Sequence, residues 1–124
     1  MGKQLAQPEV RAAIDSPLGE AEALAERAFL LEDTMHILIC DDDAVFAARV
    51  ETLVRDFFAL RGLQVECTVC HSGEETLARR DLDLYQVALL DVDLDTMNGI
   101  SLGKQLRQCS PEICLVYVLS LIHI

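Results

Sequence analysis

The sequence has few basic residues. Its 124 residues include 10 Lys and Arg against 21 Asp and Glu, which gives a formal net charge of −11. The excess of acid is spread over the chain: residues 1–34 hold three basic and seven acidic groups, and residues 35–124 hold seven and fourteen. Such a chain repels a phosphate backbone, so the composition argues against direct binding of nucleic acid.

The sequence also lacks a segment that would enter a membrane. No apolar run is long enough to span a bilayer. The first residues do not form a signal peptide, because polar side chains and a proline interrupt them at Gln4, Gln7, Pro8, Glu9 and Arg11. Five cysteines, an odd number, without a secretory signal indicate reduced thiols. We therefore expect a cytoplasmic protein without a membrane partner.

Two of these cysteines, Cys67 and Cys70, stand in the spacing C-x-x-C-H, which also occurs where haem is attached. Residues 64–69 alternate like a strand, with Val65, Cys67 and Val69 on one face. An offset of three turns Cys70 to the opposite face from Cys67. Two ligands on opposite faces cannot hold one metal or one porphyrin, so we interpret both cysteines as packing residues.

The residue pattern divides the chain into three parts. Residues 1–34 are rich in alanine and glutamate, which predicts a helical N-terminal extension. The alternative is that the chain truly begins at Met35 and that its assigned start lies too far upstream. Residues 35–118 have the length and apolar content of one domain. Residues 119–124 resemble translated read-through of a sequencing adapter, so we expect a non-native tail there and genuine sequence that ends near Val118.

Within residues 35–118, short apolar runs alternate with amphipathic stretches. These patterns predict strands at 36–40, 64–70, 86–91 and 113–118, and helices at 46–60, 72–81 and 99–108. Ser72 and Glu75 form a capping box at the start of the second helix. The first helix presents an apolar stripe of Phe46, Val50, Leu53, Phe57 and Leu60. Strands that alternate with helices predict an α/β protein with a doubly wound parallel sheet.

Acidic residues stand at the carboxyl ends of the first and third predicted strands. Asp41, Asp42 and Asp43 follow the first strand, and Asp91 ends the third. These two strands lie side by side in a sheet of this kind, which brings Asp41, Asp42 and Asp91 together. Three neighbouring carboxylates repel one another unless a cation neutralises them, and an all-oxygen set suits Mg²⁺. A carboxylate beside Mg²⁺ can also attack phosphorus. We expect Asp43 to help to cap the following helix.

Three motifs occur in order: Ile39–Asp43, Ser72–Glu75 and Leu90–Gly99. Together they resemble the receiver domain of bacterial two-component response regulators, most closely the receivers that precede LytTR-type DNA-binding domains. The resemblance implies a flavodoxin-like (CheY-like) fold. It also implies that Asp91 is the phosphoacceptor and a metal ligand, that Asp42 is a direct Mg²⁺ ligand, and that Asp41 acts through water. The backbone carbonyl of Asp93 would be the third protein ligand.

The same resemblance implies the partners. A sensor histidine kinase would be the phosphodonor, and a DNA-binding output domain outside this chain would be controlled by the phosphoryl group. The full-length parent could form a homodimer. The chain would not be an enzyme beyond self-catalysed phosphorylation and dephosphorylation.

The sequence departs from the family pattern in two places. Asp95 stands where the family usually has proline, which adds a negative charge to the loop. Receivers have a Ser or Thr at the end of the fourth strand that binds the phosphoryl group, and here this position falls on Leu119 or Ser120. The fifth strand and its Lys are absent, so we expect a truncated receiver with four of five strands. Its last strand, with Leu115 to Leu119, would be an unprotected apolar edge, which predicts poor solubility.

Two other functions fit parts of this pattern, and a third does not. Asp91-x-Asp93 after an apolar strand resembles the haloacid-dehalogenase phosphohydrolases, although Asp95 and the earlier acidic pair do not suit that family. A receiver-like interaction module that takes no phosphate is the second alternative. A calcium loop fails, because Thr96 stands where Gly is needed and Leu102 where Glu is needed.

Overall fold

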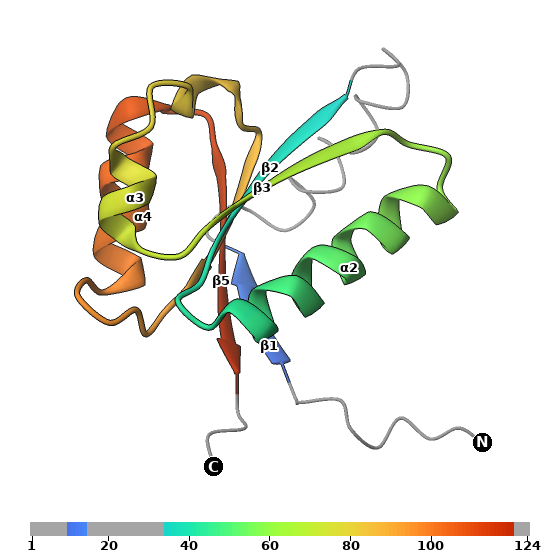
Figure 1. Cartoon of the computed structure of the whole chain (residues 1–124). Coiled ribbons are helices and arrows are strands. Elements are labelled where there is room, and N and C mark those ends of the chain that lie inside the picture. The colour runs from blue at the N-terminus through green and yellow to red at the C-terminus, as the bar shows by residue number, and fades with distance from the viewer. Residues whose placement is uncertain (1–9, 15–33, 121–124) are drawn as a thin grey trace.

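The computed structural model describes residues 10–14 and 34–120 of the chain (Figure 1). Its elements in chain order are β1 (Val10–Ile14), β2 (Met35–Cys40), α2 (Ala44–Leu60), β3 (Val65–Cys70), α3 (Gly73–Leu77), the 3₁₀-helix η1 (Leu82–Leu84), β4 (Val87–Asp91), α4 (Gly99–Cys109) and β5 (Cys114–Ser120). No helix among these residues is long and apolar enough to cross a bilayer.

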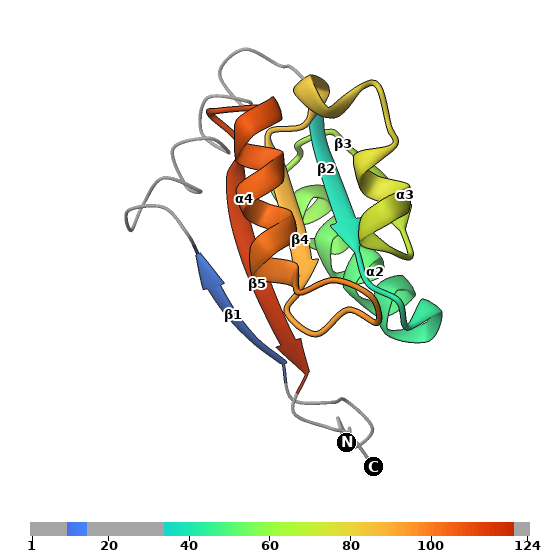
Figure 2. The ribbon, with the colours of Figure 1, turned by 90° about the vertical axis from the view of Figure 1, so that its left-hand side faces the viewer.

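The five strands form one sheet in the order β1-β5-β4-β2-β3. β2 pairs in parallel with β3 and with β4, and β4 pairs in parallel with β5. α2 covers one face of this sheet, and α3 and α4 cover the other (Figure 2). The predicted α/β class and the doubly wound sheet of four parallel strands are therefore confirmed. β1 is an addition to the prediction, and it joins β5 in the antiparallel sense.

β2 lies in the middle of the parallel strands and is buried on both faces. Its side chains alternate between two core clusters: Leu38 and Cys40 belong to the cluster that α4 covers, and Ile37 and Ile39 to the one that α2 covers. Because both faces need apolar side chains, the strand has no polar alternation. This explains why an uninterrupted apolar run leads directly to the acidic residues that follow it.

The two cysteines of β3 point to opposite faces, as the strand pattern predicted. Cys70 is fully buried in the cluster with Cys40, whereas Cys67 packs partly buried on the side of α2. Burial raises the pKa of the Cys40 thiol to about 11 and also raises that of Cys70. Thiols of this kind stay protonated at neutral pH, which fits a packing role and argues against a metal or haem ligand.

The apolar stripe predicted for α2 is partly wrong. Val50 and Phe58 are buried against the sheet, but Leu53, Phe57 and Leu60 are exposed by 56%, 44% and 84%. Phenylalanine occurs at both 57 and 58, so the period of the helix alone does not decide which of them faces the core. The buried and small Ala47 lies on the same side as Val50 and Phe58, which lets the first turns of α2 approach the sheet closely.

α3 begins with the predicted capping box. Ser72 Oγ accepts a hydrogen bond from the Glu75 backbone N–H at 2.9 Å. The Glu75 carboxylate reaches back as expected, but it accepts from the backbone N–H of His71, at 2.8 Å, rather than from that of Ser72. The cap therefore fixes the residues that connect β3 to α3, and His71 among them contacts the acidic end of β2.

Residues 10–14 form β1 and not a helix, which corrects the prediction for that part of the N-terminal extension. The rest of the predicted extension, 1–9 and 15–33, lies outside the described residues. β1 covers the outer edge of β5, so the prediction that this edge is unprotected is also wrong. An unpaired edge offers a row of backbone hydrogen bonds, whereas a short isolated helix is marginal in water. β5 continues to Ser120, past the expected limit at Val118.

Neighbouring phenylalanines in α2 give a direct test of its orientation. We expect Phe58→Ala to lower the free energy of unfolding by about 3–5 kcal/mol, because it empties a buried site. Phe57→Ala is the matched control and should cost about 1 kcal/mol, because that ring is partly exposed and is covered by the Arg61 guanidinium. Urea unfolding of both variants measures the difference, and a larger loss for Phe57→Ala would show that the helix is rotated.

Candidate functional site

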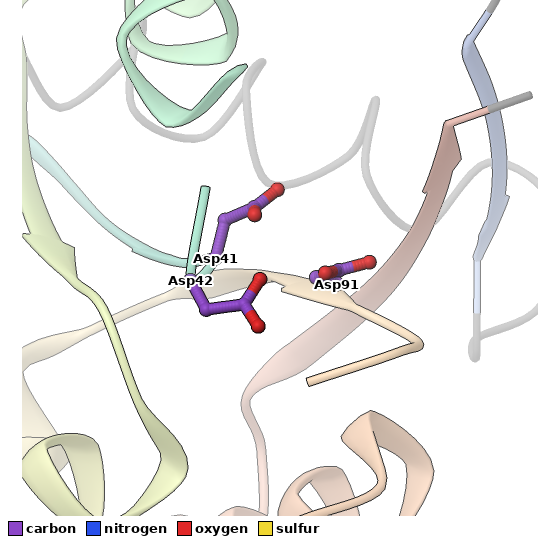
Figure 3. Close-up of side chains that lie close together, drawn as sticks. All are labelled: Asp41, Asp42 and Asp91. Atoms are coloured by element: carbon purple, nitrogen blue, oxygen red, sulfur yellow. The ribbon is translucent and has the colours of Figure 1, made fainter. Parts of the chain in front are cut away.

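Three carboxylates meet at the carboxyl ends of β2 and β4 (Figure 3). The register pairs Cys40 with Leu90, so Asp41 and Asp91 follow at the same level of two adjacent parallel strands. One carboxylate oxygen from each of Asp41, Asp42 and Asp91 lies within 4.8 Å of the others. Apart from these three, no group of His, Cys, Asp and Glu with this spacing occurs among the described residues. The sequence prediction that these aspartates converge is confirmed.

Asp41 is the innermost of the three, and its backbone and side chain are both fixed. Only 5% of the residue is exposed. Its N–H donates to the Cys70 carbonyl at 3.0 Å, and its Oδ1 accepts from the Asp43 N–H at 2.9 Å. The ring Nδ1 of His71 lies 3.1 Å from the Asp41 carbonyl oxygen, as a donor in the tautomer that carries hydrogen there. Its position is therefore set by β3 as well as by its own strand.

Asp43 has a different role from its two neighbours. Its Oδ1 accepts from the backbone N–H groups of Val45 and Phe46, both at 3.0 Å, and it is the N-cap of α2. The expectation that this residue helps to cap the helix is confirmed. Of the three consecutive aspartates, Asp41 and Asp42 are therefore the two that enter the cluster.

The environment makes the carboxyls of Asp41 and Asp42 harder to ionise than free side chains. Burial raises the pKa of Asp41 to about 6, and the charges of Asp91 and Asp42 add to this. The pKa of Asp42 is raised by burial and by a hydrogen bond and charge repulsion from Asp95. Asp95 therefore brings a fourth carboxyl to the edge of the cluster. A divalent cation would relieve this repulsion, and an all-oxygen donor set of this kind fits Mg²⁺.

The loop after β4 folds back tightly on the phosphoacceptor candidate. Asp91 Oδ1 accepts from the Asp93 N–H at 3.2 Å, and the Gly99 N–H donates to the Val92 carbonyl at 2.9 Å. A Cβ added at Gly99 would overlap the backbone carbonyl oxygen of Asp91. Glycine is needed there because the start of α4 touches the backbone of the strand end. Asn98 caps that helix, with its Oδ1 2.7 Å from the Ile100 N.

A second set of contacts ties this loop to α3. The Thr96 hydroxyl lies 2.8 Å from each carboxylate oxygen of Glu74. A Cβ added at Gly73 would meet the Met97 sulfur at 2.6 Å, so Met97 packs directly on the first residue of α3. His71, Glu74 and Thr96 could not be recognised from the sequence as residues that support the site. Their roles depend on contacts between distant segments, and no local motif signals them.

The structure shows where the backbones of the two remaining predicted site residues, Asp93 and Ser120, lie. The Asp93 side chain is exposed, and its backbone forms a bridge with Asn98, but the role of its carbonyl as a ligand stays a prediction. The register pairs Val118 with Asp91, so Ser120 follows two residues beyond that level on the neighbouring strand. This is a suitable backbone position for a phosphate-binding group, and the role of Ser120 also stays a prediction.

Fold and site together define a flavodoxin-like α/β protein with an acidic cluster at the carboxyl ends of two parallel strands. Residues 37–121 match the family model described as the response regulator receiver domain. The chain therefore belongs to the response regulator receiver family. No curated protein matches the chain.

A solved structure of a receiver has a similar fold, and other receivers show weaker similarity. A receiver domain protein from Clostridium thermocellum is 16% identical, with a TM-score of 0.52, and the match covers 65% of this chain and 61% of that one. A CheY-like receiver domain protein from Methanospirillum hungatei is 24% identical (TM-score 0.48, coverage 65% and 60%). TrrA from Thermotoga maritima, in complex with Mg²⁺ and BeF, is 18% identical (TM-score 0.47, coverage 65% of each chain). The chain thus spans slightly less than two thirds of these proteins.

Replacing Gly99 tests the close approach of α4 to β4. We expect Gly99→Ala to lower the free energy of unfolding by about 1–3 kcal/mol, because the added methyl group must push the Asp91 backbone away. Gly62→Ala is the control: its φ of +69° costs about 1 kcal/mol, with no atom in the way. Chemical denaturation of both variants measures the effect. A smaller loss for Gly99→Ala than for Gly62→Ala would contradict the packing described here.

Titration of Asp41 should make the free energy of unfolding depend on pH. Because its pKa is about 6 in the folded chain and 3.8 as a free side chain, the folded state binds more protons between these values. Without divalent cations, the free energy of unfolding should therefore fall as pH rises from about 4 to about 6, by up to about 3 kcal/mol. Asp41→Asn keeps an acceptor for the Asp43 N–H and removes this titration.

Urea unfolding in EDTA across this pH range, for the wild type and for Asp41→Asn, measures the contribution. As pH rises, the free energy of unfolding of the wild type should fall relative to that of Asp41→Asn. Mg²⁺ added at pH 7 should stabilise the wild type more than the variant. A difference that does not change with pH would show that the Asp41 carboxyl has the same pKa in the folded and the unfolded chain.

Proposed function

We propose that this chain is the phosphoacceptor module of a two-component system and that it receives a phosphoryl group on Asp91. The observation that supports this most strongly is the convergence of Asp41, Asp42 and Asp91 at one strand edge in a chain of the receiver family. Their spacing and their raised pKa values suit a divalent cation. If the aspartates only capped a helix or filled a structural role, three of them would not need to lie so close together.

The three carboxylates differ in ways that suggest different roles. Asp91 is partly exposed and ends its strand, so a phosphodonor can approach it. Asp42 is also partly exposed, whereas Asp41 is buried. We assign Asp42, Asp91 and the backbone carbonyl of Asp93 as the groups that would hold Mg²⁺, with Asp41 acting through water. Bound Mg²⁺ supplies positive charge that offsets the negative charge of the cluster and of the incoming phosphoryl group.

The proposed reaction is transfer from a phosphohistidine. An Oδ atom of Asp91 attacks phosphorus, a P–O bond forms as the P–N bond breaks, and the imidazole leaves with the electron pair and takes up a proton. The product is an acyl phosphate on Asp91. The chain contributes mainly position: the Asp93 N–H and the Gly99 contact hold Asp91 in place. Ser120 is the proposed phosphate-binding residue at the end of β5.

The resemblance to LytTR-type receivers suggests a wider role. We propose a sensor histidine kinase as the phosphodonor and the cytoplasm as the location. We also propose that the parent protein is a LytTR-type regulator with a DNA-binding output domain, able to form a homodimer. The chain would have no enzyme activity on other substrates. The added phosphoryl group, with about two negative charges, would shift the population between two arrangements of the surface around it.

A small phosphodonor tests the acceptor directly. With Mg²⁺ and acetyl phosphate or phosphoramidate, we expect the intact mass to rise by one phosphoryl group, and the rise should disappear in Asp91→Asn. Asp93→Asn is the matched control from the same loop. It should still be phosphorylated, because only its backbone is assigned a role. Asp42→Asn should slow labelling about tenfold or more at a fixed Mg²⁺ concentration, through loss of a metal ligand.

Two results would redirect the assignment. Equal labelling of the wild type and Asp91→Asn, or no labelling of either, would rule out the acceptor role and favour the interaction module that takes no phosphate. Continuous release of phosphate from several phosphate esters, many times the amount of protein, would instead favour a haloacid-dehalogenase-like phosphohydrolase.

A further inference from the structure

The loop between β4 and α4 is closed at its base and held separately at its tip. At the base, the Gly99 N–H donates to the Val92 carbonyl oxygen at 2.9 Å, and Asp93 forms a backbone bridge with Asn98. The base therefore belongs to the end of β4 and the start of α4. The tip, residues 94–97, lies between the two partners of this bridge and makes its contacts elsewhere.

The tip contacts the first turn of α3, which lies 22 residues earlier in the chain. The Thr96 hydroxyl donates to the Glu74 carboxylate and lies 2.8 Å from each of its oxygens. The Met97 sulfur packs on Gly73, where an added Cβ would lie 2.6 Å from it. Leu94 is buried in the core cluster that α4 covers. One polar contact and two apolar ones thus fix the tip.

Glu74 has a simpler explanation, which predicts a different outcome. It lies in the first turn of α3, where a negative side chain is favourable near the positive end of the helix. That explains an acidic residue at this place, but it makes no use of Thr96, whose side chain lies on an exposed loop. The interaction with the helix end is satisfied without Thr96, so what the contact adds is a restraint on the loop.

The tip controls two groups that reach the acidic cluster. The carbonyl of Asp93, which we assign as a Mg²⁺ ligand, belongs to the peptide group that joins Asp93 to Leu94, so rotation of the tip would turn it. Asp95 forms a side-chain hydrogen bond with Asp42 and brings its negative charge there. Thr96 follows Asp95 directly in the chain. The Glu74–Thr96 contact therefore restrains the residues that carry both groups.

The same end of α3 also reaches the other strand of the cluster. His71, in the connection that precedes α3, places its ring Nδ1 3.1 Å from the Asp41 carbonyl oxygen. The backbone N–H of His71 donates to the Glu75 carboxylate at 2.8 Å. Residues 71–75 therefore contact the end of β2 on one side and the loop after β4 on the other. They join the two strand ends whose carboxylates form the cluster.

We propose that Glu74 and Thr96 are positioning residues for the Mg²⁺ site, and that their contact holds the loop between β4 and α4 in the arrangement that binds the cation. Neither residue would touch the cation, and both would act through the Asp93 carbonyl and the Asp95 carboxylate. Without the contact, the tip must be ordered when the cation binds, which weakens the affinity for Mg²⁺. This inference rests on the metal site of the proposed function, and the two can fail separately.

The affinity for Mg²⁺ is measured in the full chain, from the shifts of backbone amide resonances during a titration. Thr96→Val removes the hydroxyl without a change of charge, and it should raise the dissociation constant about three- to tenfold. Thr96→Ser keeps the hydroxyl and should stay within about twofold of the wild type. Thr52→Val is the matched control and should leave the affinity unchanged, because it removes a hydroxyl that donates to the Ala48 carbonyl at 3.0 Å on α2.

A double-mutant cycle separates the contact from the charge of Glu74. Glu74→Ala removes both an acceptor and a negative charge, so by itself it should weaken Mg²⁺ binding for either reason. If Glu74 acts through Thr96, the substitution should have a much smaller effect in a Thr96→Val chain than in the wild type. If Glu74 acts only by its charge, or only on the end of α3, the effect should be the same in both chains. Urea unfolding of each variant shows that the compared chains are folded.

Two results would overturn the positioning role alone. An unchanged dissociation constant in Thr96→Val would show that the contact does not position the loop. Equal effects of Glu74→Ala in the two chains would show that Glu74 acts without Thr96. In both cases Asp42→Asn should still weaken Mg²⁺ binding, because it removes a ligand. A wild type without Mg²⁺-dependent shifts, or an Asp42→Asn chain that binds as well as the wild type, would instead overturn the proposed metal site and the positioning role with it.

Discussion

Repulsion among the carboxylates of Asp41, Asp42 and Asp91 is the constraint on which the site depends. The oxygens lie within 4.8 Å of one another at an edge of the sheet where Asp41 is almost completely buried. Left alone, the cluster makes ionisation less favourable, as the raised pKa values of Asp41 and Asp42 show. A folded chain that keeps these groups together therefore gives up stability at neutral pH, and a cation or a proton recovers it.

The rest of the fold is arranged to hold that unfavourable cluster in place. β2 and β4 are adjacent; β2 is buried on both faces and β4 is buried on one face and half-buried on the other, so their ends cannot spread apart without disrupting the core. α4 begins against the backbone of Asp91, at Gly99. Thr96 and Glu74 join the loop to α3, and His71 contacts the Asp41 carbonyl. Separate elements thus each hold one part of the acidic cluster in place.

Features with a local cause could be predicted from the sequence, and features with a distant cause could not. The strand before Asp91, the cap at Asp43 and the alternation of Cys67 and Cys70 each follow from a few neighbouring residues. The exposed position of Phe57 did not follow, because the period of α2 fits two orientations and the shape of the sheet selects one. Asp41, Asp42 and Asp91 could be brought together only because parallel sheets have a regular topology, whereas the Glu74–Thr96 contact has no such rule.

The prediction of a helix at residues 10–14 failed for the same reason, because the cause of the strand β1 lies far away in the sequence. Residues 10–14 have the alanine content of a helix former, and nothing in their neighbours predicts a strand. The open edge of β5, about a hundred residues away, supplies the hydrogen bonds that make the extended form favourable. Because β1 reaches Ser120, it also covers the end of the strand that leads to the proposed phosphate-binding position. The N-terminal strand β1 therefore belongs to the same sheet that carries the acidic cluster.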